Sequence, residues 1–246
     1  MAEQETGHID TSWLGASWVQ IKRRVAEACR AAGRDPAEVN ILPVSKTFGP
    51  EVIRAAVALG LHRFGENKAQ EIRDKSVPLA DCGIDWVMIG HLQTNKAKDV
   101  ARVVSEVQSL DRPELAAALH RRLQLEGRVI DVLVQVKTSE EPSKYGLPPA
   151  DLPEFLDTLR GYDSMRVRGL MTLAINSTTP EAVRGCFRLL RELRDQAVAR
   201  GHDLPRLSMG MSGDFPLAIA EGATEVRIGT AIFGKRPYPD SYYWPE

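Results

Sequence analysis

Residues 41–47 read Ile-Leu-Pro-Val-Ser-Lys-Thr, a short apolar run that ends in polar residues. Apolar runs of this length, bounded by turn residues, are typical of strands that are buried on both faces. The apolar part, 41–44, is the first of eight such runs along the chain. The others are 61–64, 85–89, 103–110, 130–136, 167–171, 207–209 and 226–228.

Segments with the apolar spacing of helices separate these runs. Leu115, Leu119 and Leu123 share one side of a helix predicted over 113–126, and the segment 180–200 has the same spacing. Strands that alternate with helices predict right-handed parallel βαβ units, and eight such units close a (β/α)8 barrel, the TIM barrel. The alternative is an open doubly wound sheet, but no G-x-G-x-x-G motif follows the first run.

A further helix is predicted before the first strand. Apolar residues recur at spacings of three and four from Leu14 to Val25, and Gly33 and Pro36 end the pattern. Pro43 is in tension with the first strand, because proline removes a donor from the ladder. We predict an α/β protein with a single (β/α)8 barrel over 13–236 and an extra N-terminal helix, between a polar lead, 1–12, and an aromatic, proline-rich tail, 237–246.

The bulk composition excludes several classes of function. Lys and Arg number 32 against 33 Asp and Glu, so no global field favours nucleic acid or an anionic membrane. Cys29, Cys82 and Cys186 are far apart, which argues against a disulfide framework or a thiolate zinc site. No stretch has the ~18 apolar residues of a transmembrane helix, and the start lacks a signal-peptide core. We therefore expect a cytoplasmic protein.

Lys46 is the first candidate for chemistry. In a barrel, the residues that directly follow the strands face the active site, and Lys46 follows the first run. Partial desolvation lowers the pKa of a lysine from ~10.4, so its neutral amine becomes available for a Schiff base. The alternative is an ordinary solvated lysine at a strand end.

Two loops near the end of the chain have the residues of a phosphate site. Gly229 and Thr230 follow the eighth run, where a glycine lets backbone N–H groups approach an anion and a hydroxyl can donate to it. Ser212 precedes a helix predicted over 216–221 and suits either phosphate or the helix N-cap. Loops after the seventh and eighth strands commonly bind phosphate in this fold. The alternative for Gly229 is a simple turn.

Polar residues also follow the second and third runs. Phe-Gly-Glu-Asn ends at Asn67, and Ile-Gly-His-Leu-Gln-Thr-Asn-Lys contains His91, so both segments are expected at the same mouth of the barrel. A single histidine is more often a structural hydrogen-bonding group than a base. Because no other His, Cys or carboxylate stands at ligand spacing, no metal site is predicted.

Five segments in this order resemble the pyridoxal phosphate homeostasis protein family, also called YggS-like or proline synthetase co-transcribed proteins. They are Val-Ser-Lys-Thr, Phe-Gly-Glu-Asn, Ile-Gly-His-Leu-Gln-Thr-Asn-Lys, Ser-Met-Gly-Met-Ser and Val-Arg-Ile-Gly-Thr-Ala-Ile-Phe-Gly. The resemblance covers roughly residues 17–236. It implies a fold-type III barrel similar to the N-terminal domain of alanine racemase, with pyridoxal 5'-phosphate (PLP) as cofactor and Lys46 as the residue that forms the internal aldimine.

Matched motif by motif, the resemblance also implies roles for five other residues. Ser212, Gly229 and Thr230 correspond to phosphate ligands, Arg227 to the partner of the pyridine nitrogen, and Asn67 to a residue near the cofactor ring. A permanently cationic donor at the pyridine nitrogen disfavours protonation of the ring and so weakens it as an electron sink.

The favoured hypothesis is therefore a PLP carrier that acts in vitamin B6 homeostasis without turnover of amino acids. Its expected partners are PLP and PLP-dependent recipient enzymes, with no nucleic acid and no membrane, and the resemblance implies a monomer.

The first alternative is a racemase-like PLP enzyme. It would need a second acid or base, for which His91 and Tyr145 are the candidates, and the chain has no room for the C-terminal domain of alanine racemase. The second alternative is a PLP-independent lyase with an aldolase-type Lys46. The nearest carboxylate in the sequence after Lys46 is Glu51, which is a poor match for that chemistry.

Overall fold

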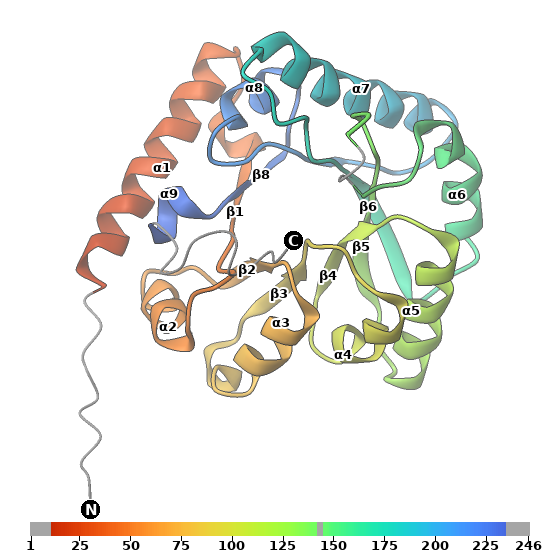
Figure 1. Cartoon of the computed structure of the whole chain (residues 1–246), viewed down its shortest axis with the longest axis horizontal. Helices are drawn as coiled ribbons and strands as arrows, with labels where there is room; N and C mark the ends of the chain where they lie inside the picture. The colour runs from red at the N-terminus through yellow and green to blue at the C-terminus, as the bar shows by residue number, and fades with distance from the viewer. Residues whose placement is uncertain (1–10, 142–144, 235–246) are drawn as a thin grey trace, which may run out of the picture.

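The eight predicted runs form eight parallel strands of one sheet, which curls into the predicted barrel (Figure 1). The computed structural model describes residues 11–141 and 145–234, so the predicted tail and nearly all of the predicted lead lie outside the described residues. The strands are β1 (Asn40–Pro43), β2 (Arg63–Glu66), β3 (Asp85–Met88), β4 (Glu106–Leu110), β5 (Ile130–Gln135), β6 (Met165–Met171), β7 (Arg206–Ser208) and β8 (Glu225–Ile228).

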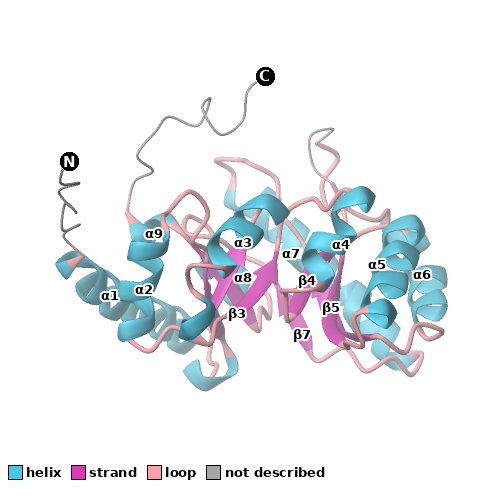
Figure 2. Ribbon diagram, turned by 90° about the horizontal axis from the view of Figure 1, so that it is seen from below, coloured by secondary structure: helices cyan, strands magenta, loops and turns pink. Residues whose placement is uncertain are grey.

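Helices surround the sheet on its outer face, and Figure 2 shows the strands enclosed between them. Proline opens α2, α5 and α7, where its fixed φ suits a first helical turn and its missing N–H is not needed. The helices are α1 (Ser12–Ala31), α2 (Pro50–Ala58), α3 (Ala69–Ser76), α4 (Ala97–Ala101), α5 (Pro113–Leu125), α6 (Leu152–Leu159), α7 (Pro180–Ala199), α8 (Phe215–Ala220) and α9 (Thr230–Phe233).

The extra N-terminal helix is confirmed. Helix α1 precedes the first strand and contacts α8 and α9, so it covers the side of the barrel near β1 and β8 (Figure 1). Its buried face consists of Leu14, Ile21, Val25 and Cys29. Within the described ranges, no helix combines the length and the apolar character that crossing a membrane requires.

The position of Pro43 resolves its tension with the first strand. β1 pairs along its length with β8, whereas a single bridge between Val44 and Gly65 joins it to β2. The N–H of Val44 donates to Ile228 in β8, and the N–H of the next residue, Ser45, donates to Gly65. Because successive N–H groups of a strand point to opposite sides, the nitrogen of Pro43 faces β2, where the ladder has few hydrogen bonds to lose.

Four charged residues close the amino-terminal end of the barrel. Arg63, Glu106, Arg206 and Glu225 are the first residues of β2, β4, β7 and β8, and each arginine contacts both carboxylates at 2.6–2.9 Å. Burial alone would raise the pKa of Glu225, but the charges of Arg63 and Arg206 outweigh it and lower that pKa. We call this set the basal charge ring.

Removal of Glu225 is expected to destabilise the protein strongly. Glu225→Ala leaves Arg63 and Arg206 with one carboxylate between them, and breaking a buried ion pair from one side costs about 3–5 kcal/mol. The free energy of unfolding in urea, followed by circular dichroism, measures this change. The control is Asp81→Ala, which breaks the exposed ion pair of Asp81 with Arg54 and should leave the free energy of unfolding nearly unchanged. Equal effects of the two variants would contradict a structural role for the ring.

Candidate functional site

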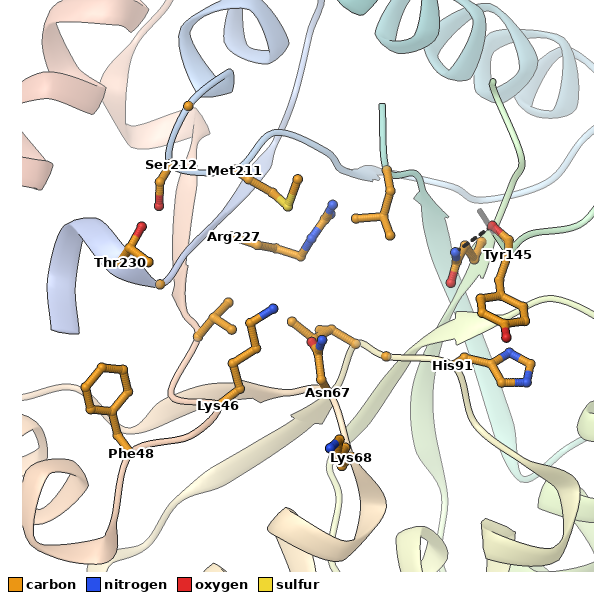
Figure 3. Close-up of a pocket in the computed structure, with 17 residues that line it drawn as sticks. Lys46, Phe48, Asn67, Lys68, His91, Tyr145, Met211, Ser212, Arg227 and Thr230 are labelled. Atoms are coloured by element: carbon orange, nitrogen blue, oxygen red, sulfur yellow. Dashed lines mark hydrogen bonds between the residues drawn. The ribbon is translucent and has the colours of Figure 1, made fainter. Parts of the chain in front are cut away.

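A cavity of about 640 Å³ opens at the carboxyl ends of the strands. Its side chains come from loops that are far apart in the sequence, as the barrel topology requires. The structure brings all six predicted site residues to this cavity, together with Lys68 and the alternative candidates His91 and Tyr145 (Figure 3). The six are Lys46, Asn67, Ser212, Arg227, Gly229 and Thr230.

Lys46 lies in a tight turn directly after β1. The N–H of Phe48 donates to the carbonyl oxygen of Ser45 at 3.1 Å, so Lys46 and Thr47 are the two central residues of the turn. Thr47 has φ 74°, and it is the one described residue other than glycine with a positive φ. The side chain of Lys46 extends into the cavity, and its amino group points to the space between Asn67 and Arg227 (Figure 3).

Glu66 corrects one expectation from the sequence. Phe-Gly-Glu of the Phe-Gly-Glu-Asn segment belongs to β2 rather than to the loop after it, and only Asn67 reaches the cavity. The carboxylate of Glu66 is fully buried and accepts hydrogen bonds from Ser45 Oγ (2.6 Å) and Lys75 Nζ (2.8 Å). Burial raises the pKa of Glu66 to about 7, although Lys75 opposes the shift.

Gly90 allows the loop after β3 to pass close to Asn67. A Cβ at position 90 would overlap the carbonyl oxygen of Asn67, so only glycine fits there without displacing the backbone. Gly90 thus lets the loops after β2 and β3 lie against each other where both line the cavity.

One side of the cavity has the features of an anion site. The hydroxyl groups of Ser212 and Thr230 point toward one another beside Gly229 (Figure 3). A Cβ on Gly229 would lie 3.3 Å from the carbonyl oxygen of Val44, so a larger residue would crowd the start of this loop. Hydroxyl groups that converge beside a glycine, where backbone N–H groups can approach an anion, are typical of a phosphate site.

The interpretation of Ser212 as a helix N-cap is wrong. Helix α8 begins at Phe215, and Asp214 occupies the N-cap position. The carboxylate of Asp214 accepts a hydrogen bond from the N–H of Met211, which closes the loop. The hydroxyl of Ser212 is therefore presented to the cavity from the loop before the helix.

Arg227 provides a buried positive charge at the centre of the site. Its Nη1 donates to Ser208 Oγ at 2.8 Å and its Nη2 donates to the carbonyl oxygen of Thr172 at 2.7 Å. Both acceptors are neutral groups, and burial lowers the pKa of Arg227 to about 10. The guanidinium is thus held in place while remaining charged at neutral pH.

A chain of hydrogen bonds joins Arg227 to the basal charge ring. Ser208 Oγ donates to Gln108 Oε1 at 2.7 Å, and the amide of Gln108 donates to Glu106 (2.6 Å) and Glu225 (2.5 Å). We did not predict this chain from the sequence. The alternation of polar residues in β4 (Glu106 and Gln108) and in β8 (Glu225 and Arg227) could have indicated it, because residues two apart on a strand face the same side.

Two stacked rings form the other side of the cavity. The centroids of His91 and Tyr145 are 3.9 Å apart with an interplanar angle of 19°. Burial lowers the pKa of His91, and the carboxylate of Asp111, 3.7 Å from Nδ1, opposes this shift only in part. The two candidates for a second acid or base are therefore packed on each other, and His91 is mainly neutral at neutral pH. Within residues 11–141 and 145–234, no group of three or more His, Cys, Asp or Glu residues could hold a metal ion.

The arrangement fits the cofactor that the motifs imply. A lysine amine can meet an aldehyde, the Ser212 and Thr230 hydroxyls can meet a phosphate, and the guanidinium of Arg227 can meet a ring nitrogen. Val44 and Ile89 line the space between them with apolar surface suited to an aromatic ring.

Two comparisons of the sequence agree with this fold. Residues 19–237 match the family described as alanine racemase, N-terminal domain. A protein of Aquifex aeolicus named pyridoxal phosphate homeostasis protein is 43% identical over 221 residues, which cover 89% of this chain and 96% of that protein.

Solved structures extend the similarity to three dimensions. PipY of Synechococcus elongatus, in a structure with PLP bound, has a TM-score of 0.79 and 34% identity, and the match covers 90% of this chain and all of PipY. Alanine racemase of Streptomyces lavendulae has a TM-score of 0.70 at 16% identity, and covers 94% of this chain and 59% of the racemase. The latter likeness concerns the fold alone. By its 43% sequence identity to a named member over 89% of its length, the chain belongs to the pyridoxal phosphate homeostasis protein family.

Proposed function

We propose that this protein binds PLP reversibly, holds it as a Schiff base on Lys46, and takes part in the balance of vitamin B6 in the cell. The observation that carries the proposal is the convergence of Lys46, the Ser212–Thr230 hydroxyl pair and Arg227 on one cavity. The name of the Aquifex relative and the PLP in the PipY structure support it.

In this proposal each residue acts on one part of the ligand. PLP supplies a reactive aldehyde and an electron-accepting ring. The Nζ of Lys46 condenses with the aldehyde and releases water, and the reverse reaction frees the ligand. Ser212, Gly229 and Thr230 hold the phosphate, Arg227 donates to the ring nitrogen, and Asn67 lies beside the ring.

The same site supports a carrier rather than an enzyme that converts amino acids. Arg227 stays cationic, and a cationic donor at the ring nitrogen keeps that nitrogen unprotonated. We place the protein in the cytoplasm because its three cysteines are free thiols, as is usual in reducing compartments. The recipients that we propose for its PLP are PLP-dependent enzymes.

Borohydride reduction is expected to attach PLP to Lys46. The protein incubated with PLP should absorb near the wavelength of a Schiff base, and after reduction one peptide, the one containing Lys46, should carry the added mass in mass spectrometry. Lys46→Ala should lose both signals, whereas Lys98→Ala, on the exposed side of α4, should keep them. An unchanged spectrum of Lys46→Ala would rule out this site.

Substitution of Thr230 is expected to weaken binding through the phosphate. Thr230→Val keeps the shape and removes a hydroxyl that donates to a charged group, so the affinity for PLP should fall about tenfold to a hundredfold. Thr230→Ser keeps the hydroxyl and should bind like the original protein. Titrations followed by absorbance measure these affinities. Pyridoxal, which lacks the phosphate, should bind all three proteins alike, and an equal loss for pyridoxal would contradict the assigned role.

The absence of turnover has its own test. In D₂O, the protein with PLP should exchange the Cα proton of alanine and of other amino acids no faster than free PLP at the same concentration, as followed by proton NMR. Exchange that is faster, saturates with the amino acid and disappears in Lys46→Ala would instead support the racemase-like alternative.

A further inference from the structure

A group of three ionisable side chains, of which two are buried and Glu71 is partly exposed, lies directly behind Lys46. Lys75 Nζ contacts Glu66 Oε1 and Glu71 Oε2, each at 2.8 Å. Glu66 ends β2, whereas Glu71 and Lys75 are one turn apart on α3. We call these residues the Glu66–Lys75–Glu71 triad. None of them lines the cavity, so contact with a ligand does not account for this arrangement.

The triad holds both peptide groups of Lys46. Lys75 Nζ donates to the carbonyl oxygen of Ser45, at 3.1 Å, which belongs to the peptide group before Lys46. The N–H of Thr47, in the peptide group after Lys46, donates to Glu71 Oε2 at 2.8 Å. The triad therefore fixes the backbone on either side of the lysine.

The turn that the triad holds is a strained one. Thr47 occupies the third position of the Ser45–Phe48 turn with φ 74°, where turns of this kind favour glycine. A β-branched residue in this region is a genuine outlier, and such strain persists only where the surroundings impose it. The hydroxyl of Thr47 has no hydrogen-bond partner among the described residues, so its own side chain does not stabilise the conformation.

The charges of the triad suit this task. Burial alone would raise the pKa of Glu71, but the charge of Lys75 and the N–H of Thr47 outweigh it and lower that pKa, so Glu71 remains an acceptor for Thr47. Lys75 has its three donors directed at Glu66, Glu71 and Ser45, which satisfies its ammonium group completely.

We infer that Glu71 and Lys75 are positioning residues, which hold Lys46 in the orientation that reaches the ligand by imposing the left-handed conformation of Thr47. This inference rests on the proposed Schiff base at Lys46. Its consequence is that glycine at position 47, which adopts a positive φ without strain, makes the contact with Glu71 dispensable.

The test combines two substitutions. Glu71→Ala removes the acceptor of the Thr47 N–H and leaves Glu66 and Lys75 paired, so no buried charge loses its only partner. We expect the rate at which PLP becomes attached to Lys46, trapped by borohydride and measured by mass spectrometry, to fall roughly tenfold. Thr47→Gly alone should keep the original rate, and Glu71→Ala with Thr47→Gly should recover most of it.

Hydrogen exchange of the ligand-free proteins gives a second readout. The Thr47 amide should exchange faster in Glu71→Ala than in the original protein, while amides of β5 keep their protection and show that the barrel is folded. Glu71→Gln, which retains an acceptor, should lie between the two. If Glu71→Ala does not fold, Glu71→Gln takes its place. The attachment rates of Thr47→Gly and of the double variant Glu71→Gln with Thr47→Gly then test the same recovery.

Two different failures can be told apart. If the original protein shows no attachment at Lys46, the proposed function fails. If the original protein is modified at Lys46 and Glu71→Ala is modified equally fast, or if Thr47→Gly gives no recovery, the positioning role is wrong while the proposed function stands.

Discussion

The pairing of β1 with β8 is the constraint on which the site depends. Asn40 to Pro43 lie in register with Glu225 to Ile228, although about three quarters of the chain separates them. Continued past the strand ends, this register sets Lys46 beside the loop of Gly229 and Thr230, within one cavity. A reactive amine and an anion site from opposite ends of the sequence thus share one mouth because the barrel closes.

The barrel interior is organised along its axis. Four charges neutralise one another at the amino-terminal end, Gln108 and Ser208 occupy the middle, and the guanidinium of Arg227 faces the cavity. Each polar group in this column finds a partner, which is what burial in a low-dielectric interior demands. The column fixes the direction of Arg227 as the triad fixes the backbone of Lys46. Both arrangements support a cavity-lining residue from behind, through Ser208 in the first case and through Glu71 and Lys75 in the second.

Much of this molecule was readable from the sequence. The apolar runs located all eight strands, and polar residues after strands one, two, seven and eight pointed to Lys46, Asn67, Ser212 and Thr230, because strand ends face the mouth in any parallel barrel. The partners of Glu66, Lys75 and Gln108 were not readable, since these hydrogen bonds join elements whose side-chain directions depend on register. The run 103–110 began too early for a different reason: Val104 lies in the core before β4 and Val103 packs against that core, so both are apolar without belonging to the strand.

The central claim is that one cavity holds PLP with its aldehyde carbon at Lys46, its phosphate at the Ser212–Thr230 side and its ring nitrogen at Arg227. A crystal structure of the protein grown with PLP tests all three contacts together. The account predicts continuous density from Lys46 Nζ into the ligand, with the phosphate against Gly229 and Thr230. A phosphate bound instead at the His91–Tyr145 side, or a ligand with no link to Lys46, would contradict it.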